Sequence, residues 1–176
     1  MKSCKVCAAE FVPTVSTMQA VCSPRCAAKV PKMARKAATV ERQQHAKALV
    51  AIKPRAKLVA EAQTAFNAWV RARDEQGCCI SCGTVNGKVN AGHYMSVGAR
   101  PELRFHPDNV HRQCERCNTF LHGNLINYRT FLMCRIGAER VEWLEGPHEP
   151  RKWIRDELLA IKADYTRRTR QLKAAS

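Results

Sequence analysis

Two short stretches of the sequence decide the fold: CISC at residues 79–82 and NVHRQCERCN at residues 109–118. Each contains two cysteines separated by two residues, Cys79 with Cys82 and Cys114 with Cys117. This spacing turns two thiolates toward one ion, and two such pairs complete the four-sulfur site that is typical of structural zinc. Cys78 with Cys82 is a weaker alternative for the first pair. The sequence therefore predicts a zinc ion that joins segments far apart in the chain.

A second set of four cysteines opens the chain. Cys4 and Cys7 are followed by Cys22 and Cys26, and this pattern predicts a second zinc ion in a short N-terminal knuckle. So short a segment buries little apolar surface, so the metal is expected to supply most of its folding energy. Both sites use four sulfurs and leave no open coordination position, which favours structural rather than catalytic zinc. Cys134, outside both sets, is expected to be an ordinary buried thiol.

The chain is strongly basic. Its 176 residues include 30 Lys and Arg against 15 Asp and Glu, for a net charge of +15. Residues 27–77 carry +7 and residues 151–176 carry +5, whereas residues 78–150 carry only +1. No apolar run approaches the roughly 18 residues of a membrane-spanning helix, and no apolar signal segment begins the chain. We therefore exclude a membrane protein, disfavour a secreted one and expect a nucleic-acid partner.

Helical periodicity surrounds the cysteine-rich middle of the chain. Residues 55–76 carry apolar side chains at helical spacing, which predicts a helix with one buried face. Residues 78–118 favour short extended pieces between turns, and residues 27–53 show little apolar periodicity. We interpret that last range as a solvated helix or a partly ordered linker.

Three more helices are predicted after the second cysteine pair, at 124–136, at 138–144 and from about 151 onward. The first of them is expected to bury Leu125, Tyr128, Phe131, Leu132 and Ile136 on one face. The fold class is therefore α+β. The expected organisation is a zinc knuckle at 1–26, a basic helical linker at 27–54, a core at 55–150 and a basic C-terminal helix at 151–176.

The stretch 109–118, together with Gly92 and His93 between the cysteine pairs, resembles HNH endonucleases with a zinc-stapled ββα-metal fold. The resemblance implies an HNH-like core in which His93 is the general base. It also implies that Asn109 orients the imidazole and that Asn118 binds a catalytic Mg²⁺ or Mn²⁺. The residue chemistry agrees, because a histidine with a pKa near ~6.5 takes a proton from water at neutral pH and an amide oxygen suits a hard cation.

One position departs from that pattern. Many HNH motifs have Asp, a metal ligand, where this sequence has Gly92, so one carboxylate is missing. His111 and His122 are further candidate ligands. His111 would share a strand face with Asn109 if the segment is extended, and His122 would share a helix face with Asn118 if the helix has begun there. A non-catalytic polar role is the alternative for each of these two histidines.

The order of motifs along the whole chain resembles the NinG (Rap) family of lambdoid-phage recombination proteins. The N-terminal four-cysteine knuckle and a basic helical stretch come first. They are followed, in family order, by Cys79 to Gly83, Ala91-Gly92-His93-Tyr94, Leu103-Arg104-Phe105, Asn109-Val-His111, Cys114-x2-Cys117-Asn118 and Gly123-Asn124-Leu125.

This second resemblance implies a structure-specific endonuclease that cuts branched DNA, such as Holliday junctions and D-loops, in the cytoplasm of the bacterial host. Branched double-stranded DNA is the expected partner, and a second copy of the chain and recombination proteins of phage or host are further candidates. Six arginines are expected to contact DNA: Arg104, Arg112, Arg129, Arg167, Arg168 and Arg170.

Two other functions compete with the nuclease. A double zinc-ribbon protein that binds DNA or RNA without cutting it is favoured by Gly92. A zinc-stabilised assembly factor associated with ribosomes is supported only by the charge. The arrangement of His93, Asn109 and Asn118 around the cysteine pairs favours the enzyme.

Overall fold

The structure, a computed structural model, describes residues 1–51 and 53–175, with the side chains of residues 47, 50 and 51 left aside. The chain forms two compact units, Met1–Lys53 and Pro54–Ser176. The division falls at the end of the expected linker. The expected knuckle and linker lie together in the first unit, and the expected core and C-terminal helix lie together in the second. Among the described helices, none is both long and apolar enough to cross a membrane.

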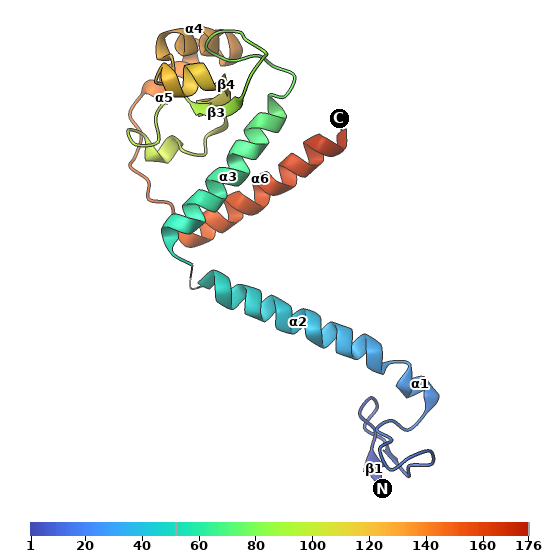
Figure 1. Cartoon of the computed structure of the whole chain (residues 1–176). Coiled ribbons are helices and arrows are strands. Elements are labelled where there is room, and N and C mark those ends of the chain that lie inside the picture. Colours follow the sequence, from blue (N-terminus) through green and yellow to red (C-terminus); the bar gives the residue numbers. More distant parts are fainter. Residues whose placement is uncertain (52, 176) are drawn as a thin grey trace. The chain divides into compact units, whose positions relative to one another are not determined.

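The first unit is a small cysteine-rich knuckle followed by a long helix (Figure 1). Strands β1 (Lys2–Ser3) and β2 (Glu10–Phe11) pair in antiparallel register, Lys2 with Phe11. Ser23 caps the N-terminus of helix α1 (Pro24–Ala27), because its side chain accepts a hydrogen bond from the backbone N–H of Cys26. Helix α2 (Val30–Ala51) then runs for 22 residues, and all of its described side chains are exposed.

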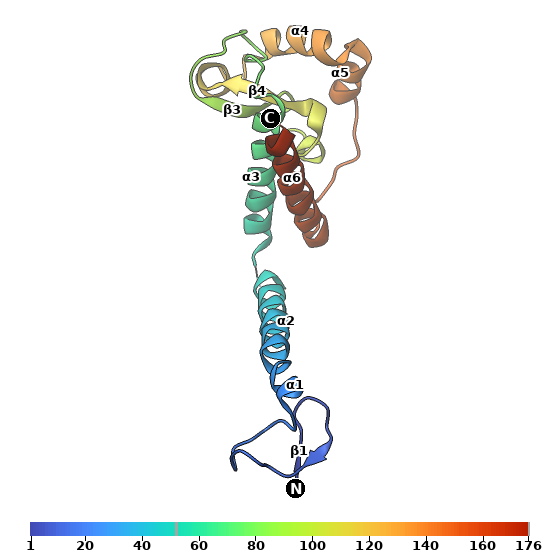
Figure 2. The same ribbon diagram turned by 90° about the vertical axis from the view of Figure 1, so that its right-hand side faces the viewer.

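The second unit is built on two long helices that lie side by side in both ribbon views, α3 (Arg55–Arg73) and α6 (Arg155–Ala175) (Figures 1 and 2). The Phe66 ring meets the Tyr165 ring edge-on at 4.7 Å, and the Trp69 ring lies 4.9 Å from the same tyrosine. The two helices and the adjoining hairpin share one apolar core: Leu58, Ala62, Phe66, Trp69, Val70, Phe105, Val110, Leu158 and Tyr165.

In the sequence between α3 and α6, the chain forms an antiparallel hairpin of β3 (Val89–His93) and β4 (Val110–Cys114). His93 pairs with Val110 at one end of the ladder, and Val89 pairs with Cys114 at the other. The connection between the strands contains two 3₁₀ turns, η1 (Pro101–Leu103) and η2 (Pro107–Asn109). Ala91 and Val110 pack with α3 on one side of the hairpin.

After β4 come the short π-helix η3 (Arg116–Phe120), α4 (Leu125–Ile136) and α5 (Ala138–Glu145). Helices α4 and α5 form a second apolar cluster with residues from the segments before and after β3: Ile80, Tyr94, Leu103, Tyr128, Leu132, Val141 and Leu144. The Tyr128 hydroxyl donates a 2.9 Å hydrogen bond to the carbonyl oxygen of Gly92, so α4 packs against the hairpin face opposite α3.

The α+β class and the predicted helices at 55–76, 124–136 and 138–144 are confirmed with small shifts in their ends. The last helix begins at Arg155 rather than near 151, because the Glu157 carboxylate accepts the backbone N–H of Ile154 and caps the first turn. The expected buried face of α4 is only partly correct. Leu125 and Phe131 are 49% and 48% exposed, and the Cys134 thiol, expected to be buried, is exposed.

A buried carboxylate ties the second unit together. Asp74 follows α3, is 3% exposed, and accepts hydrogen bonds from Arg73 at 2.8 and 2.7 Å and from Arg135 on α4 at 2.6 Å. The backbone N–H of Arg112 on β4 donates to the same carboxylate at 3.0 Å. Burial alone raises the pKa of Asp74, but the hydrogen bonds and charge of Arg73, with help from Arg112 and Arg135, outweigh it and lower the pKa.

We expect Asp74→Asn to lower the free energy of unfolding by about 2–3 kcal/mol, because two arginines lose a buried charge partner. Urea unfolding of the zinc-loaded chain measures this loss. Asp164→Asn is the matched control, since Asp164 pairs with Arg168 at the surface and should cost less than about 1 kcal/mol. Equal losses of stability in the two variants would show that the buried ion pairs of Asp74 contribute no more to stability than the surface pair of Asp164.

Candidate functional site

Each predicted set of four cysteines comes together in the structure. In both sets, Cys4, Cys7, Cys22 and Cys26 and then Cys79, Cys82, Cys114 and Cys117, the four sulfurs lie within 4.8 Å of one another. Sulfur–sulfur distances of 3.5 and 3.7 Å in the first set and 3.8 Å in the second fit a tetrahedron around one ion. A Zn–S bond of ~2.3 Å implies a sulfur–sulfur edge of about 3.8 Å. Both clusters can therefore hold zinc, as the sequence predicts.

The electrostatics of the first cluster also favour a cation. The backbone N–H of Val6 is the main cause that lowers the pKa of Cys4 to about 6. The pKa of Cys22 rises to about 12, because the thiols of Cys7, Cys4 and Cys26 crowd around it. Four thiolates at this spacing repel one another, so a bound dication is what allows all of them to lose their protons.

The second cluster joins the loop at Cys79 and Cys82 to the end of β4 at Cys114 and to η3 at Cys117. Cys79 and Cys117 are 2% and 1% exposed. Burial, followed by the neighbouring thiols of the cluster, raises the pKa of Cys82 to about 12. A metal at this site fixes the end of the hairpin that is opposite to His93, since Val89 pairs with Cys114 and His93 pairs with Val110.

His93 is half-buried at the end of β3, and its ring makes one defined contact. The Nε2 atom lies 3.0 Å from the backbone carbonyl oxygen of Arg104. Burial lowers the pKa of His93, the hydrogen bond to Arg104 opposes this, and the charge of Arg104 adds to the lowering. The imidazole is therefore neutral at physiological pH and is held at a fixed angle by the loop.

Asn109 is fully buried at the end of η2, and its side chain ties the loop between the strands. Its Oδ1 accepts the backbone N–H of Met95 at 2.7 Å, and its Nδ2 donates to the carbonyls of Met95 and Leu103 at 3.0 and 3.1 Å. The side chain makes no hydrogen bond to the imidazole within the described residues. Instead it anchors Leu103, the residue before Arg104, and so positions His93 indirectly.

The space beside Gly92 is already filled. A Cβ on Gly92 would lie 2.9 Å from both Cβ and Cδ of Gln113, so no side chain fits there. Gln113 is fully buried, and its Nε2 donates to Ser81 Oγ at 2.8 Å and to the carbonyl oxygen of Gly123 at 2.6 Å. Its Oε1 has no partner within the described chain. Gly92 is therefore required by packing, and the motif's carboxylate is excluded rather than merely absent.

The other expected metal ligands lie in different segments of the second unit. Asn118 lies half-buried in η3. His122 lies beyond the end of η3 with a φ of +47°, so it shares no helix face with Asn118. His111 is 2% exposed with its Nδ1 3.3 Å from the Tyr128 hydroxyl, and burial, with the nearby Arg73 and Arg135, lowers its pKa to about 3. Asn109 lies in η2 and not in β4, so the expected shared strand face is also incorrect.

Two of the expected DNA-contacting arginines, Arg112 and Arg129, form hydrogen bonds or ion pairs with other residues of the second unit. The Arg112 guanidinium donates to the carbonyls of Glu75 and Val85 at 3.0 and 3.1 Å. Arg129 pairs with the Glu145 carboxylate through two bonds of 2.7 and 3.1 Å. These contacts hold the loop at 75–85 and join α4 to α5, which are structural tasks that the sequence did not reveal.

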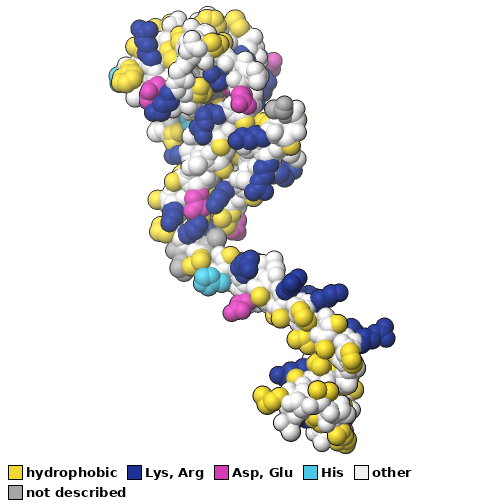
Figure 3. Space-filling view, turned by 45° about the vertical axis from the view of Figure 1, so that its right-hand side comes forward, with side chains coloured by type: hydrophobic (Ala, Val, Ile, Leu, Met, Phe, Trp, Pro, Cys, Tyr) yellow, Lys and Arg dark blue, Asp and Glu magenta, His cyan; other side chains and the backbone are white. Residues whose placement is uncertain are grey.

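The remaining four arginines differ in exposure, since Arg104 is half-buried and the three on α6 are exposed. Arg104 lies beside His93, and its Nη1 donates to the side chain of Gln63 at 3.2 Å. Arg167 and Arg168 on α6 both pair with Asp164, and the exposed Arg170 lies on the same helix. On the face drawn in Figure 3, Lys and Arg side chains predominate over acidic ones in both units. This charge distribution suits a polyanionic ligand.

A comparison of the chain with known families identifies the family to which it belongs. A family model described as "Bacteriophage Lambda NinG protein" matches residues 1–175. The chain belongs to the NinG family. Proteins named "Protein ninG" from Escherichia phage lambda and Escherichia phage 933W are each 43% identical to it over 125 residues, and one from Salmonella phage P22 is 42% identical over the same length.

These alignments with NinG proteins cover 70% of this chain but only 61% to 62% of each relative. The chain thus spans less than two thirds of the length of these relatives. No solved structure is significantly similar to it. Membership in the NinG family supports an origin in a bacteriophage and agrees with a place in phage recombination.

For this NinG family member we expect two zinc ions per purified chain, measured by elemental analysis. Cys114→Ser should lose one of them and abolish cooperative unfolding of the second unit, because its thiolate is both a ligand and a core residue. Cys134→Ser, which changes an exposed thiol outside both clusters, should keep both ions and the parent stability. A parent chain with one ion or none contradicts the prediction.

Gly92→Asp tests whether the missing carboxylate of the HNH pattern has room in the structure. We expect a loss of about 1–3 kcal/mol in the free energy of unfolding, since the new side chain collides with Gln113. Gly98→Asp is the control, because a Cβ at Gly98 has nothing within 4 Å. Equal stability of the two variants in urea would mean that Gln113 moves away freely.

Proposed function

We propose that this chain is a structure-specific DNA endonuclease that hydrolyses phosphodiester bonds in branched DNA, with His93 as the general base. The observation that carries the proposal is the 3.0 Å contact between His93 Nε2 and the carbonyl oxygen of Arg104. A carbonyl oxygen only accepts hydrogen bonds, so Nε2 must carry the hydrogen. In the neutral ring the lone pair is then on Nδ1, which is free to take a proton from water.

Burial supports the same role by keeping the ring neutral. The lowered pKa of His93 means that the basic form predominates at physiological pH. The proton acceptor is also held in place, because Asn109 ties Met95 and Leu103 together on either side of the loop that carries Arg104. A general base that is neutral and fixed in orientation has the two properties that proton abstraction needs.

The surroundings of His93 support a phosphate as the ligand. The half-buried guanidinium of Arg104 lies beside the ring, and burial followed by the charge of Arg55 lowers its pKa. A bound anion would offset the repulsion between these two positive charges. Water that gives its proton to Nδ1 attacks the phosphorus of a phosphate held near these arginines, and the P–O bond to one sugar oxygen breaks. The leaving sugar oxygen takes a proton from solvent, so the products are a 5′- or 3′-phosphate and a sugar hydroxyl.

The residues present do not fit a resident Mg²⁺ or Mn²⁺. Within the described chain, the only groups of three or more potential His, Cys, Asp or Glu ligands are the two all-cysteine clusters. Hard cations prefer oxygen ligands and usually at least one carboxylate. The motif offers only the Asn118 amide, because Gly92 stands where many HNH motifs have the Asp ligand. The proposal therefore contains no step through such an ion, and cleavage assays with and without Mg²⁺ or Mn²⁺ decide whether one is required.

One observation favours the alternative, a zinc-stabilised protein that binds nucleic acid without cutting it. Gln113 fills the space of the carboxylate that many HNH motifs have, so this chain lacks a usual element of catalysis. Branch specificity in either case rests on membership in the NinG family and not on the geometry of the site. The two proposals differ in the effect of removing His93.

His93→Ala should lower the rate of junction cleavage by about 10²–10⁴-fold, because it removes the proton acceptor. Zinc content, stability and affinity for a labelled four-way junction should stay close to the parent values, because the side chain is neither a zinc ligand nor a core residue. His45→Ala, at an exposed position on α2, should cleave at the parent rate. Parent-rate cleavage by His93→Ala would exclude the role of His93 as the base.

The same assay across pH tests the state of the ring. A general base acts when it is unprotonated, so kcat/KM should rise with pH through the pKa of His93 and then level off. Because burial lowers that pKa, the midpoint of the rise in kcat/KM should lie below pH ~6.5. An acidic limb well above this value would assign the titration to another group.

A further inference from the structure

Helix α2 is long, and its described side chains are not buried by the rest of the first unit. It runs from Val30 to Ala51, and every one of its described side chains is exposed. Four large apolar side chains are among them, Val30, Met33, Val40 and Leu49, at 43%, 50%, 45% and 47% exposure, and the first three lie on one face. Most helices in proteins owe their stability to packing of an apolar face, so a helix exposed on all sides calls for a partner.

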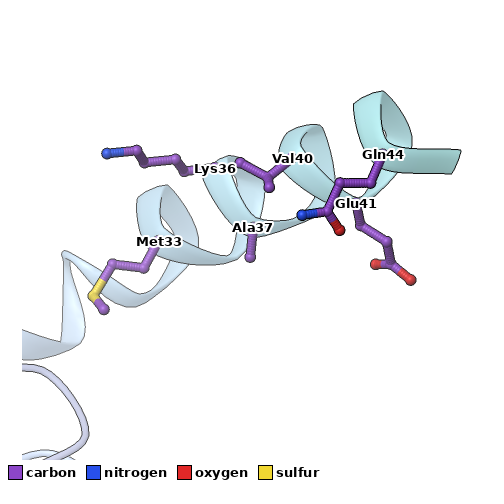
Figure 4. Close-up of a pocket in the computed structure, with 6 residues that line it drawn as sticks. All are labelled: Met33, Lys36, Ala37, Val40, Glu41 and Gln44. Carbon is purple, nitrogen blue, oxygen red and sulfur yellow. The ribbon is translucent and has the colours of Figure 1, made fainter. Parts of the chain in front are cut away.

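The exposed apolar residues of α2 follow a heptad pattern. Val30, Met33, Ala37, Val40 and Gln44 are spaced alternately by three and four residues, which are the a and d positions of a two-stranded coiled coil. Figure 4 shows Met33, Ala37, Val40 and Gln44 on one stretch of α2, with Lys36 and Glu41 flanking them, and no other segment lines this shallow pocket. We define these five a and d residues as the α2 seam.

We propose that the α2 seam pairs in parallel with the α2 seam of a second copy of this chain. The charges beside the seam favour this occupant. Lys36 is at a g position and Glu41 at the following e position, so in a parallel pair Lys36 lies opposite Glu41 of the partner subunit, and the contact forms twice by symmetry. In an antiparallel pair g residues face g residues and e residues face e residues, so this attraction is lost.

Two further features fit a second helix on this face. At the N-terminal end of α2, Val6, Ala20 and Val21 of the knuckle and Val30, Met33 and Ala37 of the helix line a groove of about 450 Å³, which continues the apolar surface. At the C-terminal end of the seam, Gln44 is at an a position, where a single polar residue specifies register and the number of strands at a cost in stability.

Three basic residues of α2 lie away from the α2 seam. Lys32, Arg35 and Arg42 are at c and f positions, so they point away from a paired helix and remain exposed in the dimer. Nucleic acid would bind that outer face, so the α2 seam remains available to the α2 seam of a second copy of the chain. The inference goes beyond the proposed nuclease function and does not depend on it.

The test is sedimentation equilibrium of the full zinc-loaded chain without DNA. We expect the parent to dimerise in a concentration-dependent manner. Lys36→Glu should raise the dissociation constant roughly tenfold, because two attractive pairs become repulsive. Glu41→Lys should have a similar effect, and the double variant should return to the parent value. Only a parallel register brings these two positions together, so this rescue also tests the orientation.

Arg35→Glu is the matched control, since it makes the same charge change one residue away on the outer face of the helix. It should leave the dissociation constant unchanged, and Val40→Ser should weaken the dimer as Lys36→Glu does. Helical circular dichroism and zinc content verify that each variant is folded. A monomeric parent, a dimer insensitive to Val40→Ser, or a double variant that fails to recover would each overturn the proposal.

Discussion

The carboxylate of Asp74 joins three elements that are distant in sequence. It receives the guanidinium groups of Arg73 and Arg135 and the backbone N–H of Arg112, so the end of α3, strand β4 and helix α4 meet at one buried charge. Arg73 extends the link, because it also donates to the carbonyls of Pro107 and Val110 at 2.9 and 2.8 Å. The loop that carries His93's hydrogen-bond acceptor ends at this same point. The orientation of His93 therefore depends on the ion pairs of Asp74 with Arg73 and Arg135, which hold the end of its loop. The second cysteine cluster holds the opposite end of the hairpin.

Local signals in the sequence predicted most of the secondary structure. The helical spacing of Leu58, Ala62, Phe66, Trp69 and Val70 corresponds to the buried face of α3, because these residues pack against α6 and the hairpin. The same reasoning failed for Leu125, Phe131 and Cys134, since α4 has fewer neighbours than its apolar residues suggest. It also missed the seam of α2, where Ala37 and Gln44 at core positions obscured the period. Periodicity shows which face of a helix is apolar, and the surrounding elements decide whether that face is covered.

The candidate site was predictable to the extent that it depends on spacing. Cysteines two or three residues apart identify both sulfur clusters, because a knuckle of that length leaves little choice of geometry. The resemblance named His93 as the base and Asn109 as the residue that orients it, but nothing in the sequence indicated that Arg104 would contribute a backbone carbonyl. Gln113 was also missed, since a glutamine in an alternating strand gives no sign that it fills the space beside a glycine in the neighbouring strand. Contacts through the backbone and contacts across a sheet arise only when distant segments meet.

The pairing of α3 with α6 also affects how the protein is made. Glu61 and Lys162, which form an ion pair between these helices, are 101 positions apart in the chain. The ribosome therefore releases α3, the hairpin and the second set of cysteines well before the helix that completes their core. At roughly 5–20 residues per second, several seconds pass in which Phe66 and Trp69 have no Tyr165 to cover them. A polypeptide that terminates early lacks the same helix, so an unfinished product has no stable core and is a substrate for the host's proteases. The core that supports the candidate site at His93 is thus complete only once synthesis has passed α6.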